Sequence, residues 1–265
     1  MKKTVFLATA TILGGLMAAS AVSAATYPTA TTANTTGDVS FKAPDPNNTP
    51  DKPVTPGTDP DNPDHPDQPG NGGNENKGNL VLKWVSDFHF GDDHTISPKT
   101  EVYSAAQTKS KQGNYTPNYV EVYDQRGVNT GWDLTVTQNG DFKGEKTGAV
   151  LAGAQMSLVA PTLSEFRNGS TSTIDTSAIK SDGTLNKGKT IDVMNAKQGT
   201  MPGRYFGLFH GKATNDATPL DDGVTLTVPG NAALMDKYST TMTWTLTAAP
   251  DGSQTPATPA TPAAK

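Results

Sequence analysis

GWDLTVTQ at residues 131–138 and TMTWTLTAAP at residues 241–250 each place a Trp-x-Leu triplet inside an alternating pattern. Successive side chains of an extended strand point to opposite faces. Trp132 and Leu134 therefore share one face of a predicted strand, and Trp244 and Leu246 share one face of another. The two stretches predict β-strands that each have one strongly apolar face.

Further alternating stretches extend this prediction along the chain. They lie at residues 80–84, 119–123, 156–159, 191–193, 204–210 and 224–228. Clusters of Gly, Asn and Asp separate them, as in Asn139-Gly140-Asp141 and Asp221-Asp222-Gly223. Short strands with turns between them predict an all-β fold, either an antiparallel β-sandwich or a barrel-like domain with long loops. Only residues 231–237 suggest a helical turn or two, and residues 162–189 read as loops or poorly regular strands.

The body of the fold is expected at residues 80–250, preceded by a segment of different composition. Residues 44–79 are rich in Pro, Asp and Asn and almost lack apolar side chains, which predicts a disordered acidic linker. Before it, residues 38–42 (DVSFK) read as an early strand with Val39 and Phe41 on one face.

Both ends of the chain carry signals of other kinds. Lys2 and Lys3, an apolar run and Val22-Ser23-Ala24 predict a secretory signal peptide at residues 1–24. Residues 251–265 repeat Ala-Thr-Pro and predict a stiff, solvated tail. No later apolar run approaches the length of a membrane span, so we expect a secreted protein without a membrane span.

Composition excludes several classes of function. The formal net charge is −5 and would become more negative once Lys2 and Lys3 are removed, so nucleic acid is not an expected partner. The chain has no cysteine, which removes disulfides, thiol nucleophiles and Cys-type zinc sites.

The chain also lacks the common catalytic motifs. No G-x-S-x-G, H-E-x-x-H, P-loop or Rossmann pattern occurs, so we expect no enzyme and no cofactor. His89, Asp92, Asp93 and His94 read more readily as a solvated loop than as a metal site, and no metal is expected.

The Trp-x-Leu residues allow two interpretations. Trp132, Leu134, Trp244 and Leu246 fill the core of a sandwich, or one or both indoles lie near the surface as platforms for sugar rings or peptide stems. The two interpretations are compatible if one Trp is buried and the other lies at a rim.

An ordered set of motifs resembles one known family. The set comprises Val39-Ser40-Phe41, the Pro/Asp/Asn-rich linker, Leu80-Val81-Leu82, Phe88-His89-Phe90-Gly91, Val122-Tyr123-Asp124-Gln125-Arg126-Gly127, Gly131-Trp132-Asp133-Leu134, Val228-Pro229-Gly230, Tyr238 and Thr243-Trp244-Thr245-Leu246 with Pro250. In this order they resemble the WxL-domain cell-surface proteins of low-GC Gram-positive bacteria. The Ala-Thr-Pro tail and His89, where an acidic or amide residue is more usual, depart from that pattern.

The resemblance implies a function and partners. It implies one WxL domain over residues 25–250 that attaches non-covalently to the cell wall, with peptidoglycan as ligand. It also implies neighbouring surface proteins of the WxL-interacting type as partners, so an adhesin or a subunit of a surface complex is the alternative function. Trp132, Leu134, Trp244 and Leu246 are the motif and binding candidates, either as ligand contacts or as the framework that presents the site.

Overall fold

The computed structural model describes residues 26–34, 39–47, 52–58, 62–127, 130–166, 183–197, 200, 202–210 and 219–248. The predicted signal peptide and tail lie outside them. The chain divides into a unit of residues 1–42 and a unit of residues 43–265. None of the described residues is helical, and so no membrane-spanning helix occurs among them. Residues 231–237, expected as a helical turn, form an irregular turn in which Asn231 has a φ of 59°.

The first unit contains a small hairpin in place of the expected early strand. Strands β1 (Thr26–Thr29) and β2 (Thr32–Asn34) pair antiparallel. Residues 39–42 form no strand, and the side chains of Val39 and Phe41 are exposed. The prediction of a strand at residues 38–42 is therefore wrong for its described part, because two alternating apolar residues form a strand only when a partner supplies the ladder of hydrogen bonds.

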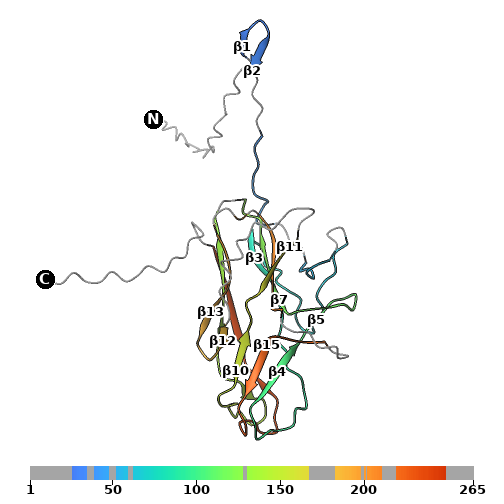
Figure 1. Ribbon diagram of the computed structural model, residues 1–265, viewed down its shortest axis with the longest axis vertical. Coiled ribbons are helices and arrows are strands. Elements are labelled where there is room, and N and C mark those ends of the chain that lie inside the picture. The colour runs from blue at the N-terminus through green and yellow to red at the C-terminus, as the bar shows by residue number, and fades with distance from the viewer. Residues whose placement is uncertain are drawn as a thin grey trace, which may run out of the picture. The chain divides into compact units, whose positions relative to one another are not determined.

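The second unit is built from antiparallel strands (Figure 1). The longer strands are β3 (Leu80–Val85), β4 (Glu101–Ala106), β7 (Tyr119–Asp124), β8 (Trp132–Gln138), β10 (Gln155–Leu158), β11 (Thr162–Phe166), β12 (Gly183–Leu185), β13 (Thr190–Ala196), β14 (Gly203–Leu208), β15 (Leu220–Val228) and β17 (Met242–Ala248). Two-residue strands are β5 (Thr108–Lys109), β6 (Tyr115–Thr116), β9 (Lys143–Gly144) and β16 (Tyr238–Ser239). All eight alternating stretches of the sequence are strands.

Three open sheets make up most of this unit. Their strand orders are β12-β10-β15-β4, β11-β14-β7-β3 and β13-β8-β17. None of them closes into a barrel, so the fold is sandwich-like. The inner faces of the three sheets share one hydrophobic core, which includes Val122, Leu134, Leu158, Tyr205 and Val224. This confirms the predicted all-β sandwich.

One strand departs from the alternation that its sequence suggests. Leu82 and Trp84 were expected on one face, but the pairing of β3 with β7 shifts register between them through a β-bulge. Leu82 packs against the main core, whereas Trp84 lies in a second cluster with Val54, Tyr119 and Phe206. The sheet β11-β14-β7-β3 is consequently buried on both faces.

The segment that covers the outer face of this sheet comes from the expected linker. Val54, Thr55 and Asp64 are buried, and Asn74 bonds to β3 at its bulge: its backbone N–H donates to the Lys83 carbonyl at 2.9 Å and its side-chain amide to the Leu82 carbonyl at 2.9 Å. The prediction of disorder is therefore wrong for residues 52–58 and 62–79. The segment is ordered by polar groups that bond to the sheet rather than by an apolar face of its own. We call residues 52–58 the strap.

Side chains of the sheet bind the backbone of the strap. The Glu121 carboxylate accepts a hydrogen bond from the Val54 N–H at 3.0 Å. It also forms an ion pair with the Arg204 guanidinium at 2.7 Å. Arg204 also donates to the Lys52 carbonyl at 3.1 Å, and the Tyr119 hydroxyl donates to the Val54 carbonyl at 3.0 Å. Both charged groups are buried, so each satisfies the other where water cannot reach.

Candidate functional site

The two Trp-x-Leu strands are neighbours in one sheet. Strand β17 pairs antiparallel with β8, so that Leu246 lies opposite Leu134, Trp244 opposite Val136 and Ala248 opposite Trp132. Because opposite residues of paired strands point to the same face, both Trp-x-Leu triplets face the core. The prediction that Trp and Leu of each motif share one strand face is confirmed. The two motifs also share the same face of the sheet.

The two indoles differ in burial. Trp132 and Leu134 are 0% exposed, and the Trp132 ring lies 6.1 Å from that of Tyr205. Trp244 and Leu246 are partly buried at the border of the core. The Trp244 ring lies 6.4 Å from Phe88 and 6.2 Å from Phe209, which places it behind the wall of the pocket described below. Thus Trp132 is a core residue, and Trp244 links the core to that wall.

The turn before the first motif is fixed by one ion pair. Arg126 binds Asp124 through two nitrogens at 3.0 and 2.8 Å and also donates to the carbonyls of Thr130 and Gly131. Gly127 has a φ of 65°, which favours glycine. Residues 124–127 are therefore a structural turn held by an Arg–Asp ion pair.

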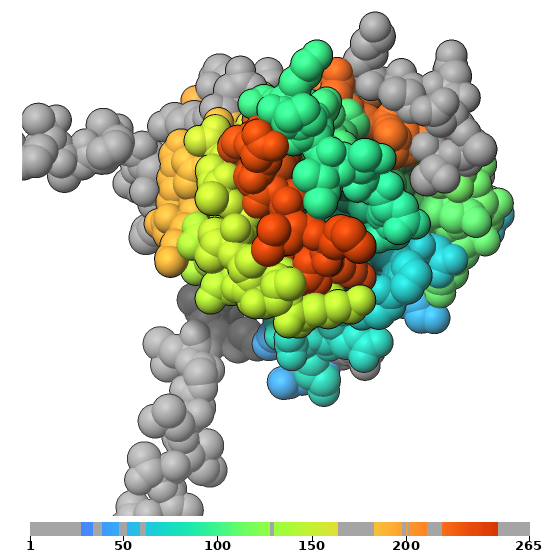
Figure 2. All heavy atoms as spheres, turned by 90° about the horizontal axis from the view of Figure 1, so that it is seen from below, coloured from blue at the N-terminus to red at the C-terminus, as the bar shows by residue number. Residues whose placement is uncertain are grey.

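A pocket of about 780 Å³ opens at one end of the second unit. Its walls come from residues 88–103, 146–151 and 226–238. Figure 2 shows these segments gathered at the same end of the body, the C-terminal part in red between yellow-green and blue-green neighbours. Phe88-His89-Phe90-Gly91, Val228-Pro229 and Tyr238, quoted above for the family resemblance, all line it.

One wall of the pocket is held by Asp236. Its carboxylate accepts from the Thr147 hydroxyl at 2.6 Å, from the Thr147 N–H at 2.7 Å and from the backbone N–H groups of Lys146 and Lys237. The Thr147 hydroxyl bond, followed by these backbone bonds, lowers the pKa of Asp236 to about 2. A Cβ on Gly144 would lie 2.3 Å from the Asp236 carboxylate, so this close approach requires glycine.

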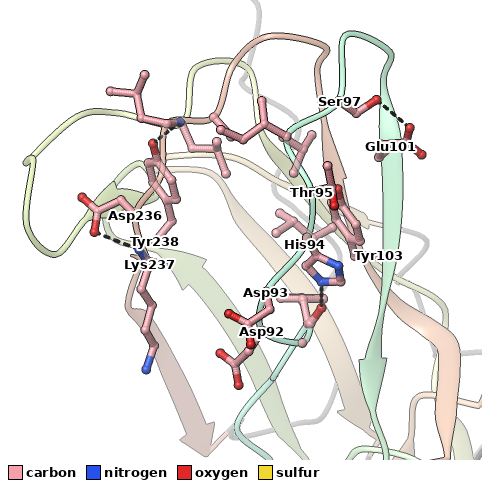
Figure 3. A pocket seen from close by; sticks show the side chains of 18 of the residues that line it. Asp92, Asp93, His94, Thr95, Ser97, Glu101, Tyr103, Asp236, Lys237 and Tyr238 are labelled. Atoms are coloured by element: carbon pink, nitrogen blue, oxygen red, sulfur yellow. Dashed lines mark hydrogen bonds between the residues drawn. The ribbon is translucent and has the colours of Figure 1, made fainter.

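The opposite wall is formed by the loop after β3 (Figure 3). The His94 ring stacks on Tyr103 with centroids 4.0 Å apart and bonds to the Phe90 carbonyl at 2.7 Å. His89 lies 3.3 Å from Asp92. His94 is therefore engaged in holding the loop. No group of three or more His, Asp or Glu residues in the described part of the chain is arranged to hold a metal ion.

The rim of the pocket carries exposed apolar and charged side chains. Ile96, Leu234 and Met235 are 45%, 54% and 90% exposed. Lys99, Lys146 and Asp93 also line the pocket, and none of the three makes an ion pair with another described residue. Lys237 lies 3.9 Å from Glu145 at the surface. The pocket thus offers aliphatic groups and charges of both signs to a ligand.

The model of the family described as WxL domain surface cell wall-binding matches residues 28–250. The chain belongs to the WxL family. This is a family of cell-wall-binding domains rather than of enzymes, and its members are surface proteins, so this WxL protein is a cell-wall-associated surface protein. Comparisons with curated proteins and with solved structures gave no match.

Sequence reasoning located the WxL strands but did not assemble the pocket. It named His89, Asp92, Asp93 and His94 only as a loop, and it gave no role to Leu234, Met235, Lys146 or Asp236. The apolar pair Leu234-Met235, next to the turn-forming Pro229-Gly230-Asn231, was the sequence feature that could have indicated an exposed binding surface. The role of Trp132, Leu134, Trp244 and Leu246 as binding residues stays a prediction.

Proposed function

We propose that this WxL protein holds itself on the cell surface by binding peptidoglycan non-covalently in the pocket at the end of the sandwich. The observation that carries the proposal is the position of the pocket. Its walls contain family-like segments and are backed by Trp244 through Phe88. A concave site with aliphatic and polar groups is the usual form of a small-ligand site.

In this proposal the WxL residues act mainly by presenting the site. Trp132 and Leu134 are fully buried and have no surface to offer a wall polymer. Trp244 supports Phe88, which lines the pocket. The two motifs hold β8 and β17 together at the edge of their sheet, next to the pocket wall. The side chains at the rim of the pocket contact the ligand.

Sedimentation with sacculi stripped of teichoic acids tests the proposal. The wild-type protein should pellet with them, and a double variant Leu234→Ser and Met235→Ser should bind about tenfold more weakly, because it loses two exposed aliphatic contacts. Val102→Ser is the matched control: Val102 is 61% exposed on β4 and does not line the pocket. A wild-type protein that stays in the supernatant contradicts the proposal.

Strand β17 favours a second candidate function, binding to a protein partner of the WxL-interacting type. It lies at the edge of its sheet and pairs only with β8 among the described strands. Edge strands accept an added strand from a partner. A pull-down that compares sacculi with candidate surface proteins separates the two functions, since retention of proteins alone would favour this one.

A further inference from the structure

The exposed groups of the pocket favour one part of peptidoglycan over the other. Peptidoglycan offers a glycan strand, whose rings stack on flat aromatic faces, and short peptide stems, which carry small aliphatic side chains, ammonium groups and carboxylates. The two ligand classes need different surfaces, so the pocket chemistry discriminates between them. This inference rests on the proposed function above.

The phenylalanine and tyrosine rings that line the pocket pack against other side chains. The face of Tyr103 is covered by His94 at 4.0 Å, and Phe88 packs against Phe209 at 6.1 Å and Trp244 at 6.4 Å. Phe90 and Tyr238 are partly buried against the main core, and the Tyr238 hydroxyl accepts a hydrogen bond from the Leu234 N–H at 2.8 Å. None of the three tryptophans is among the lining residues. A sugar ring therefore finds no open aromatic platform of the kind used for stacking.

The groups that remain available are aliphatic or charged. Leu234 and Met235 present most of their side chains to solvent, and methionine adapts to irregular small groups. Lys99 and Lys146 offer ammonium groups to a carboxylate, and Asp93 offers a carboxylate to an ammonium. Asp93 lies across the pocket from Asp236 and Tyr238 (Figure 3), so a ligand in the pocket passes between the two walls.

The walls are fixed before any ligand arrives. Asp236 ties residues 146–147 to residue 237, as described above. On the other side the Asn231 N–H donates to the Ser97 carbonyl at 2.9 Å, and a Cβ on Gly230 would lie 2.2 Å from the Pro98 carbonyl oxygen. A pre-formed pocket loses less conformational entropy on binding, which suits a short, flexible ligand.

From these observations we infer that the pocket binds the peptide stem of peptidoglycan rather than its glycan strand. The stem's aliphatic side chains contact Leu234 and Met235, a carboxylate binds Lys99 or Lys146, and an ammonium binds Asp93. The pocket volume of about 780 Å³ is within the range that accommodates a ligand of a few residues.

The test uses the full chain and three probes: intact sacculi, sacculi treated with an amidase that removes the stems, and soluble stem peptides. Binding to intact sacculi should fall at least tenfold after amidase treatment, and soluble stems should compete with intact sacculi. Replacing Lys99 and Lys146 by Gln should weaken stem binding about tenfold, whereas the matched change of exposed Lys111 and Lys189 should not.

The outcomes distinguish this inference from the function on which it rests. Full binding to amidase-treated sacculi without competition by stems overturns the inference and leaves peptidoglycan binding intact. Absence of binding to intact sacculi overturns the proposed function itself. Equal losses in the Lys99/Lys146 variant and in the Lys111/Lys189 control would also contradict the assigned charge contacts.

Discussion

A single carboxylate, Glu121, joins the central strand β7 to the strap that covers it. Burial raises the pKa of Glu121 to about 7, and the Arg204 guanidinium and the Val54 N–H oppose this rise. The glutamates of an unfolded chain have a pKa of about 4.3. Between these values the folded protein holds a proton that the unfolded chain has released, so the contribution of Glu121 to stability is lost as the pH rises toward 7.

We expect the free energy of unfolding to fall between pH 5 and pH 8 by roughly 1 to 3 kcal/mol through this group. Glu121→Gln should lack this component of the pH dependence, so the stability of the wild type relative to this variant should fall as the pH rises from 5 to 8. Urea unfolding at several pH values measures both effects. Exposed Glu75→Gln is the control, and a difference between wild type and Glu121→Gln that stays constant with pH would refute the assignment.

The two WxL indoles should differ in their effect on stability. Trp132→Ala removes a fully buried ring and should cost about 3 to 5 kcal/mol, whereas Trp244→Ala removes a partly buried one and should cost less. Urea unfolding followed by circular dichroism compares the two. Equal losses would mean that burial does not separate the roles of the motifs.

Trp244→Ala should also weaken binding to sacculi while the protein remains folded, because Phe88 loses its support. The sequence predicted that all four WxL side chains lie on apolar strand faces. It left open which indole is buried, since that depends on neighbouring sheets rather than on alternation.

Strands with a strongly alternating sequence were predictable, including the edge strands β3, β13 and β17, and weakly alternating ones were not. The eight strands predicted within residues 80–250 are present, whereas β4 was not predicted, and β11 and β12 lie in the stretch expected to form loops or poorly regular strands. Each of these three lies at the edge of its sheet. An edge strand has one partner and can be less buried, and on β4 the side chain of Val102 points to solvent.

The sequence also did not predict the bulge in β3. Leu80, Leu82 and Trp84 alternate, but one extra residue in the ladder turns Trp84 to the outer face. A bulge is set by what both faces of the sheet pack against. Here the strap supplies Val54 as a packing partner for the outer cluster, and sequence alternation carries no record of that contact.

Asn74 should be the side chain that contributes most to holding the preceding segment on the edge strand β3. Asn74→Ala removes the amide that bonds to the Leu82 carbonyl, and we expect a loss of about 1 to 2 kcal/mol in the free energy of unfolding. Proteolysis should also become faster within residues 62–79. Lys77→Ala, at an exposed neighbouring position, serves as the control and should leave both readouts near wild type.

Composition alone misjudged the segment before the body. A Pro- and Asp-rich stretch has too few apolar groups to fold by itself, which is why disorder was predicted. It becomes ordered because the sheet provides Glu121, Arg204 and Tyr119 as partners for its backbone. The pocket likewise combines three segments that are far apart in sequence, so no local pattern could assemble it.

Truncation tests the role of this segment in the molecule. A chain that begins at residue 43 should fold and stay monodisperse. A chain that begins at Leu80 exposes Trp84, Tyr119 and Phe206 together with the Glu121–Arg204 pair, and it should aggregate. Size-exclusion chromatography and dye binding to exposed apolar surface compare the two. A soluble, stable chain beginning at Leu80 would show that the strap is dispensable.

The contact between Arg204 and the Lys52 carbonyl spans 152 residues. A ribosome that adds about 5 to 20 residues per second needs roughly 8 to 30 seconds to make that length of chain. During this delay the Lys52 carbonyl lacks its Arg204 partner. Pro53 and Pro56 have no backbone N–H to donate, so the waiting strap cannot readily pair with the wrong strand before its final partner is made.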